Sequence, residues 1–212
     1  MGVEWRQLTL GKNDRGMLIG ATGSGKTFLG RYLIEDQEKP FSVVYDAKIS
    51  ESIGRWSNHE FITDFDTLIE SDARRIVYRP NYIEAVDPAA QDQFFEWVYQ
   101  RQHTRLFVDE AYAVTGGSNP SFHFQACLSR GRERGISTLV ATQRPHRIPL
   151  ITLSEAEHYW IFRLTLLQDR KRVEEITGIT AEEQLDLRNH EFFYFSVFEG
   201  RYPRKLKLSI EG

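Results

Sequence analysis

The chain has 212 residues and a formal net charge of −3. This charge excludes a generally basic nucleic-acid coat, so any contact with nucleic acid must come from local patches. With 41% hydrophobic residues the chain can bury a full core, and its length predicts one large α/β domain, or one domain with a small appendage. We expect a single domain over residues 1–212. The single cysteine, Cys127, excludes an intramolecular disulfide and favours a reducing cytoplasm. No apolar run reaches membrane-spanning length, and no signal-peptide pattern is expected at the N-terminus.

Short apolar runs alternate with helical patterns along the chain. Strands are predicted at 3–10, 17–19, 41–46, 75–80, 105–110, 136–142 and 159–164, followed by a hairpin of 192–198 and 201–208. One helix is predicted to follow residue 27 and to include Leu29 and Leu33, and another to open at Asp87-Pro88 and to include Phe94 and Val98. Further helices are predicted at about 66–71, through 124–128 to Gly135, around 169–177 and at 180–188, with a loop and a short helix within 47–60. This alternation predicts a mostly parallel sheet covered on both faces.

Residues 20–27 fit the phosphate-binding pattern G-x-x-x-x-G-K-[ST] between a predicted strand and a predicted helix. The predicted nucleotide-binding residues are Gly20, Ala21, Thr22, Gly23, Ser24, Gly25, Lys26 and Thr27. We expect the three glycines to adopt positive φ, so that backbone N–H groups approach phosphate oxygens. Lys26 is expected at the β/γ-phosphates, and the hydroxyl of Thr27 at Mg²⁺. The sequence therefore predicts a nucleoside-triphosphate site.

A second chemical motif follows the strand at 105–110. Asp109 ends the apolar run, where its carboxylate can hold Mg²⁺ beside Thr27. Glu110 comes next and can polarise an attacking water as a general base. This pair favours hydrolysis over phosphoryl transfer to a small substrate.

Two further sets of polar residues lie near the next strand. Gln143 ends that strand, where a polar amide can sense the γ-phosphate or position the water. Arg130, Arg132 and Arg134 precede the strand, at the end of a predicted helix. They either complement the negative end of that helix or act as an arginine finger on a neighbouring subunit. Arg163 is a more remote candidate for the finger.

In these stretches the chain resembles the HerA–FtsK superfamily of P-loop ATPases. The resemblance rests on residues 20–27, 44–48, 108–110 and 135–145, in that order. The last stretch, ending in Ala-Thr-Gln-Arg-Pro, is the most specific. The resemblance implies a motor core of about 15–165, and it covers the C-terminal helices and hairpin of about 166–210 only loosely. The family usually has Asp-Pro-Lys where this chain has Asp46, Ala47 and Lys48, which leaves the role of Lys48 open.

The small size of the chain is similar to that of genome-packaging ATPases of tailless, internal-membrane viruses with double-stranded DNA. This resemblance implies a three-layer P-loop fold with strand order 5-1-4-3-2 and a triphosphate at a subunit boundary. It also implies ATP and Mg²⁺ as cofactors. The implied partners are double-stranded DNA, further copies of the chain in a ring of five or six, and a capsid vertex or portal protein. The implied location is the host cytoplasm and the packaging vertex.

Several alternatives stay open for the function. The chain can be a cellular DNA-processing or conjugation translocase, or an assembly or secretion ATPase that moves protein. A P-loop kinase is disfavoured by the Asp109–Glu110 pair, and a GTPase by the lack of an Asn-Lys-x-Asp motif. If DNA is moved, the candidate contact segments are 49–59, with Arg55, Trp56 and His59, and 113–122, with its glycines, Ser118 and Asn119.

Overall fold

The computed structural model describes residues 8–35, 41–116, 120–199 and 203–209. The described strands are β1 (Arg15–Ile19), β2 (Phe41–Tyr45), β3 (Glu60–Ile62), β4 (Arg75–Tyr78), β5 (Thr104–Val108), β6 (Ser137–Thr142), β7 (His158–Phe162), β8 (Glu191–Ser196) and β9 (Arg204–Lys207). They form one sheet of order β3-β4-β2-β5-β6-β1-β7-β8-β9. The strands from β3 to β7 in this order are parallel, and β8 and β9 add an antiparallel hairpin.

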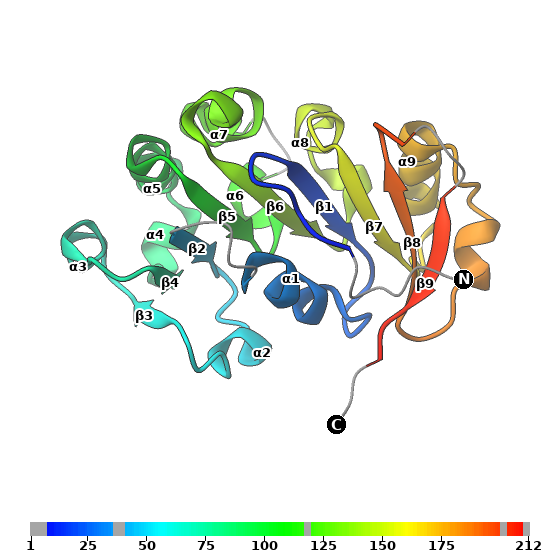
Figure 1. Cartoon of the computed structure of the whole chain (residues 1–212), viewed down its shortest axis with the longest axis horizontal. Helices are drawn as coiled ribbons and strands as arrows, with labels where there is room; N and C mark the ends of the chain where they lie inside the picture. Colours follow the sequence, from blue (N-terminus) through cyan, green and yellow to red (C-terminus); the bar gives the residue numbers. More distant parts are fainter. Residues whose placement is uncertain (1–7, 36–40, 117–119, 200–202, 210–212) are drawn as a thin grey trace.

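The predicted fold class is therefore confirmed. The five central strands β7-β1-β6-β5-β2 correspond to the expected order 5-1-4-3-2. Two short strands, β3 and β4, extend the sheet at one end, and the hairpin extends it at the other (Figure 1). Because β8 pairs directly with β7, the C-terminal hairpin continues the sheet of the motor core.

Helices cover both faces of the sheet (Figure 1). The described α-helices are α1 (Lys26–Glu35), α2 (Glu51–Gly54), α3 (Phe65–Glu70), α4 (Tyr82–Val86), α5 (Pro88–Arg101), α6 (Ala111–Thr115), α7 (Phe122–Arg130), α8 (Leu150–Ser154) and α9 (Leu167–Thr177). On one face α5, α7, α8 and α9 enclose a core that includes Phe94, Phe124 and Val173. On the other face α1 and α2 cover a second core that includes Leu29 and Ile53.

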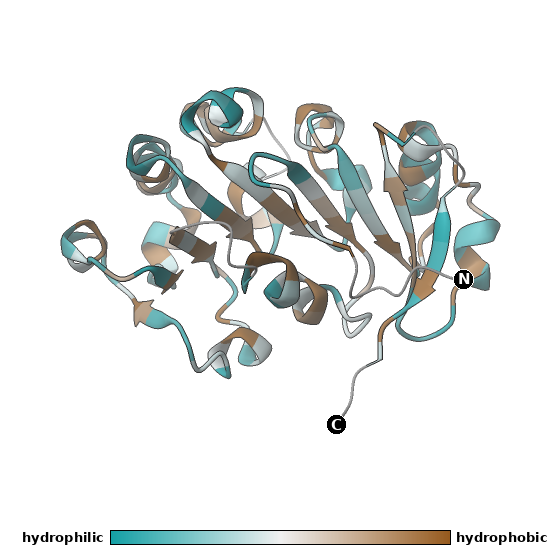
Figure 2. Cartoon of the chain, viewed as in Figure 1, coloured by the Kyte–Doolittle hydropathy of each residue, from teal (hydrophilic) through white to brown (hydrophobic). Residues whose placement is uncertain are grey.

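Burial explains why the sheet lies between these layers. The central strands are buried on both sides, at every residue of β5 and β6, so each face must be covered. Figure 2 shows hydrophobic stretches in β2 and β5. The last strand, β9, is Arg-Lys-Leu-Lys and is mostly hydrophilic, which suits an edge strand because charged side chains discourage pairing with other chains.

Local signals fixed several element boundaries as predicted. Asp87 caps α5 by accepting a hydrogen bond from the backbone N–H of Ala89 at 3.0 Å, and Pro88 occupies the first turn. Gly178 ends α9 with a φ of 74°, a left-handed conformation that glycine adopts without steric cost.

Other predictions of local structure are wrong. Residues 8–10 form no strand, and the rest of the strand predicted at 3–10 lies outside the described residues. The helix predicted at 180–188 is reduced to a short 3₁₀ turn, Glu183–Asp186, which is η4. The helix predicted to run to Gly135 ends at Arg130, and the 3₁₀ helix η2 (Gly131–Arg134) follows. The sequence patterns did not predict β3, α4, α6 and α8, which are three to five residues long and too short to show a periodicity.

Candidate functional site

The phosphate-binding loop joins β1 to α1 at the carboxyl edge of the sheet. Its first residues are fixed between two neighbouring strands. The backbone N–H of Gly20 donates to the carbonyl oxygen of Thr142, and that of Ala21 to the carbonyl oxygen of Arg163, both at 3.1 Å. Gly23 and Gly25 have φ of 74° and 108°, as predicted. The loop is therefore anchored to β6 on one side and to the end of β7 on the other.

Gly20 does not have the positive φ that the sequence predicted for it. It is required for a different reason, because a Cβ at this position would lie 2.6 Å from the Cβ of Phe162 and 2.9 Å from the hydroxyl of Ser24. Close packing of the loop against β7, and not a left-handed backbone, excludes a side chain here.

Lys26 is the most buried cation of the loop. Its ammonium donates to the carbonyl oxygens of Gly20 at 2.8 Å and Ala21 at 2.9 Å. Burial lowers the pKa of Lys26 from 10.5 to about 8, and the carboxylates of Asp109 and Glu110 only partly oppose this shift. An ammonium that is costly to bury gains strongly from an anionic ligand, so this side chain is suited to phosphate.

Thr27 and Asp109 meet although 82 residues separate them. The hydroxyl of Thr27 donates to the carboxylate of Asp109 at 3.0 Å. Burial raises the pKa of Asp109 to about 6. The hydroxyl oxygen of Thr27 and the carboxylate oxygens of Asp109 are hard ligand atoms next to the phosphate-binding loop. They fit Mg²⁺, which is bound by one or two protein ligands together with phosphates and waters. Within the described ranges no group of three or more His, Cys, Asp or Glu side chains forms a metal site of its own.

Glu110 lies directly behind this pair and is held at both carboxylate oxygens. One oxygen accepts a hydrogen bond from the ammonium of Lys48 at 2.8 Å, and the other accepts one from the hydroxyl of Thr142 at 3.2 Å. Glu110 is only 6% exposed. The sequence placed Glu110 correctly at the strand end but gave no indication of its ion pair with Lys48.

Gln143 reaches the phosphate-binding loop as predicted. Its side-chain oxygen accepts a hydrogen bond from the hydroxyl of Thr22 at 2.7 Å. Because Gln143 follows β6, which lies between β5 and β1, its amide is placed between the carboxylates after β5 and the loop after β1. A side chain in this position can contact both a phosphate and a nearby water.

These residues surround a cavity of about 410 Å³. Its lining residues are Thr22, Gly23, Gly25, Lys26, Thr27, Phe28, Lys48, Ser50, Ser52, Asp109, Gln143 and His190. Of these, His190 was missed because it comes from the C-terminal part, just before β8. Its Nδ1 lies 3.2 Å from the carbonyl oxygen of Ser24, so the C-terminal part contributes directly to the loop.

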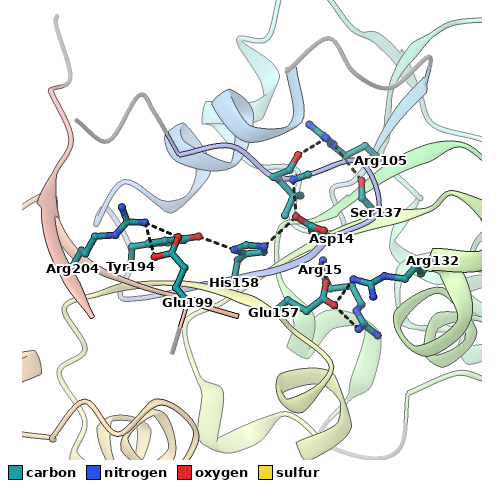
Figure 3. A network of polar contacts seen from close by, with 12 residues as sticks. Asp14, Arg15, Arg105, Arg132, Ser137, Glu157, His158, Tyr194, Glu199 and Arg204 are labelled. Atoms are coloured by element: carbon teal, nitrogen blue, oxygen red, sulfur yellow. Dashed lines mark hydrogen bonds and ion pairs between the residues drawn. The ribbon is translucent and has the colours of Figure 1, made fainter. Parts of the chain in front are cut away.

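The three arginines proposed as fingers lie at the opposite edge of the sheet. They precede β6, whose six residues span about 20 Å, whereas the phosphate-binding loop follows the parallel strand β1. Arg132 pairs with the buried carboxylate of Glu157 at 2.6 Å, and Glu157 also pairs with Arg15 at 2.9 Å (Figure 3). None of these arginines can therefore serve the phosphates of its own chain.

The two other finger candidates differ from Arg132 in their surroundings. Arg134 lies over the ring of Tyr99 at 4.3 Å from its centroid. Arg130 is exposed and makes no ion pair with any described residue. Arg163 is different again, because it lies beside the phosphate-binding loop of its own chain and lines a smaller cavity of about 190 Å³ there.

The predicted DNA-contact segment 49–59 is only partly available for contact. Trp56 is buried, and its ring lies 5.2 Å from that of His59. Burial lowers the pKa of His59 to about 4. The expectation that Trp56 contacts a polymer is therefore wrong, because its ring packs into the core beside α1 and α2. His59 is half-buried against this ring, and its contact with a polymer stays a prediction. Arg55 remains exposed, and among the described residues its ion-pair partner is Glu51, one helical turn away.

The second predicted segment, 113–122, begins within α6 and reaches the start of α7. Gly117, Ser118 and Asn119 lie outside the described residues. Gly116 ends α6 with a φ of 53°.

No helix in the described part of the chain is long and apolar enough to cross a membrane.

No family model matches the chain. A curated relative, DNA packaging ATPase P9 of Enterobacteria phage PRD1, is 27% identical over 177 residues, which cover 81% of this chain and 74% of that protein. Among solved structures, the genome packaging NTPase B204 of Sulfolobus turreted icosahedral virus 2 in complex with ATP-γS has a TM-score of 0.75 at 20% identity. This match covers 95% of this chain and 100% of that chain.

A second solved structure, VirB4 of Thermoanaerobacter pseudethanolicus, has a TM-score of 0.73 at 11% identity and covers 94% of this chain and 90% of that chain. At these identities the solved structures bear on the fold alone, and they confirm the P-loop ATPase fold. The sequence relative confirms the resemblance to genome-packaging ATPases of the HerA–FtsK superfamily.

Proposed function

We propose that this chain is an ATP-hydrolysing motor that moves double-stranded DNA into a preformed viral capsid. The observation that carries the proposal is the convergence of Lys26, Thr27, Asp109 and Gln143 on one cavity, with Glu110 immediately behind them. The similarity to a DNA packaging ATPase supports DNA as the polymer that is moved.

Each residue of the cavity has a role that follows from its chemistry. Lys26 exchanges its backbone carbonyl partners for phosphate oxygens, and the N–H groups of the loop bind the remaining phosphate charge. Thr27 and Asp109 would hold Mg²⁺, which neutralises charge on the β- and γ-phosphates when it is bound. Gln143 orients the attacking water, and the carboxylate of Glu110 takes its proton.

The arginines at the other edge of the sheet complete the site from a neighbouring subunit. Arg130, Arg132 and Arg134 are the candidates, because an arginine that cannot reach the phosphates of its own chain can still serve those of the next subunit in a ring. A ring also gives the DNA a central path, and it requires a docking partner at a capsid vertex or portal in the host cytoplasm.

Hydrolysis itself is tested by two substitutions and a control. Lys26→Ala should lose nucleotide binding or turnover. Glu110→Gln should bind ATP but hydrolyse it at least about 100-fold more slowly, since a general base is worth this much. Glu182→Gln removes an exposed carboxylate that does not line the cavity and should keep the wild-type rate. Equal rates for Glu110→Gln and wild type would remove Glu110 from the mechanism.

The need for a neighbouring subunit is tested by mixing variants. Subunits with Glu110→Gln and subunits with Arg132→Ala should be inactive alone and regain activity together, because mixed interfaces contain one intact pair. The same experiment with Arg130→Ala and Arg134→Ala identifies the finger. Full activity of all three arginine variants, or an activity per subunit that does not depend on concentration, would contradict the ring.

The identity of the polymer is tested by measuring how binding and hydrolysis depend on salt concentration and on the length of duplex DNA. Binding through phosphates should weaken steeply with salt and be nearly indifferent to base sequence. Arg55→Ala should reduce stimulation of hydrolysis by duplex DNA, whereas Lys171→Ala, on the exposed side of α9, should not. If duplex DNA of any length neither binds at low salt nor raises the rate, a motor that moves protein becomes the better proposal.

A further inference from the structure

The loop after β6 is held in place by a side chain of α9. The 3₁₀ helix η3 (Pro145–Arg147) lies in this loop, directly after Gln143 and Arg144. The carboxylate of Asp169, in the first turn of α9, accepts a hydrogen bond from Nε of Arg144 at 2.9 Å and another from the backbone N–H of His146 at 3.1 Å. Asp169 therefore fixes the backbone on the far side of Gln143.

The carboxylate of Asp169 is almost fully removed from water. The side chain of Asp169 is 1% exposed, whereas that of Arg144 is 35% exposed. A buried carboxylate is costly unless a cation and hydrogen-bond donors satisfy it, and removal of one partner leaves an uncompensated charge. Its place in the first turn of α9 is favourable as well, because the N-terminal end of a helix carries partial positive charge. The ion pair is therefore a fixed attachment of the loop to α9.

On its near side, Gln143 is fixed by the end of β6. The hydroxyl of Thr142 accepts a hydrogen bond from the backbone N–H of Arg144 at 3.1 Å and donates to the carboxylate of Glu110 at 3.2 Å. The side chain of Gln143 lies between these two fixed neighbours and accepts a hydrogen bond from the hydroxyl of Thr22 at 2.7 Å. Its position at the nucleotide cavity thus depends on β6 and on α9 together.

The next residue of α9 holds the loop that follows β7. Arg170 is buried and donates to the carbonyl oxygens of Leu164 at 3.3 Å and Thr165 at 2.6 Å. The residue just before this loop, Arg163, accepts the hydrogen bond from the backbone N–H of Ala21 in the phosphate-binding loop. The beginning of α9 therefore attaches both strand-end loops that contact the phosphate-binding loop.

We propose that Asp169 is a positioning residue for hydrolysis, which acts through Arg144 and the backbone of the loop to hold Gln143 at the nucleotide. This inference rests on the proposed function, because Gln143 is the residue assigned there to orient the attacking water. Asp169 does not line the cavity, and the phosphates are bound by Lys26 and the N–H groups of the phosphate-binding loop. Loss of the ion pair should therefore lower kcat and spare the binding of ATP.

The test measures kcat and the KM for ATP in Asp169→Asn, which keeps the size of the side chain and removes its charge. The kcat should fall at least about tenfold, because misplacement of a positioning group by about 1 Å can cost about 100-fold. The KM should change by less than about twofold, since the interactions that bind ATP are retained. Thermal unfolding verifies that the variant folds.

The matched control is Asp92→Asn. The carboxylate of Asp92 likewise accepts a hydrogen bond from the backbone N–H of a histidine, His123, at 2.8 Å, and it lies 2.9 Å from Nδ1 of the same residue. Asp92 belongs to α5 and does not line the cavity, so this variant should keep the wild-type kcat.

A double substitution separates the placement of Gln143 from a general loss of structure. Gln143→Ala should itself lower kcat, and adding Asp169→Asn should then cause no further loss, because the side chain through which Asp169 acts is gone. Losses that multiply would overturn the proposal. So would full activity of Gln143→Ala, an unchanged kcat in folded Asp169→Asn, or a rise in KM that accounts for the lost rate.

Arg144→Met breaks the same ion pair from its more exposed end, and it provides the test if Asp169→Asn does not fold. It should cause the same loss of kcat, and Arg144→Lys, which keeps a cation near the carboxylate, a smaller one. A loss in Arg144→Met without one in Asp169→Asn would show that Arg144 acts by itself, which contradicts positioning by Asp169. If wild type hydrolyses ATP and Glu110→Gln does not, the proposed function stands whatever these variants give. A wild type without hydrolysis refutes both.

Discussion

Lys26 should make the free energy of unfolding depend on pH in a defined window. Burial lowers its pKa in the folded chain from 10.5 to about 8. Below pH 8 both states carry the proton, and the folded state bears the full cost of the buried charge. Between pH 8 and 10.5 the folded chain releases the proton while the unfolded chain keeps it, so the free energy of unfolding rises with pH.

The size of this effect follows from the two pKa values. The difference between 10.5 and about 8 corresponds to about 3.4 kcal/mol in all, of which about 2 kcal/mol arises between pH 8 and pH 10. Lys26→Met keeps a long apolar side chain and cannot titrate. The free energy of unfolding of wild type minus that of Lys26→Met should therefore increase by about 2 kcal/mol from pH 8 to pH 10.

The assay is urea unfolding of both proteins at a series of pH values, without nucleotide. Other groups that titrate in this range, such as Cys127 and the tyrosines, are common to both proteins and cancel in the difference. Lys171→Met removes an exposed ammonium and serves as a control that should run parallel to wild type. If wild type and Lys26→Met also run parallel, the ammonium is not buried at a cost, and the reasoning about Lys26 is refuted.

Three further predictions concern residues that support the site or lie in the core. Asp46→Asn should lower the free energy of unfolding by about 3 kcal/mol, since it leaves Arg79 without its buried partner; a loss below about 1 kcal/mol in urea would contradict this. Gly25→Ala should lower the melting temperature more than Gly23→Ala. A Cβ at Gly25 would lie 2.7 Å from the side chain of Leu208, whereas a Cβ at Gly23 would meet no atom within 4 Å. Equal melting temperatures of the two variants would show that the side chain of Leu208 moves aside. Burial raises the pKa of Cys127 to about 12, so the native chain should resist alkylation at pH 8 and react fully in urea.

The sequence alone was sufficient for the parts of the site that are local in the chain. The phosphate-binding loop, the carboxylates at 109 and 110 and the cap at Asp87 are defined by neighbours within a few residues. The alternation of strands and helices then restricted the fold to a parallel sheet, and the carboxyl ends of its strands placed Thr27, Asp109 and Gln143 at one edge. The extent of a single domain and the catalytic roles of these residues remain predictions.

Contacts between distant residues were decided only by the tertiary structure. Lys48 meets Glu110 across 62 positions, and His190 meets Ser24 across 166. Trp56 has the composition of a contact residue in an exposed loop, yet it packs into the core on α1 and α2. A strand pattern shows which face of each strand is buried, but it does not show which side chains of separate loops meet above the sheet. That depends on how the strands are ordered and how each loop folds back, which is why the ion pair of Lys48 with Glu110 and the contribution of the C-terminal part emerge only from the folded chain.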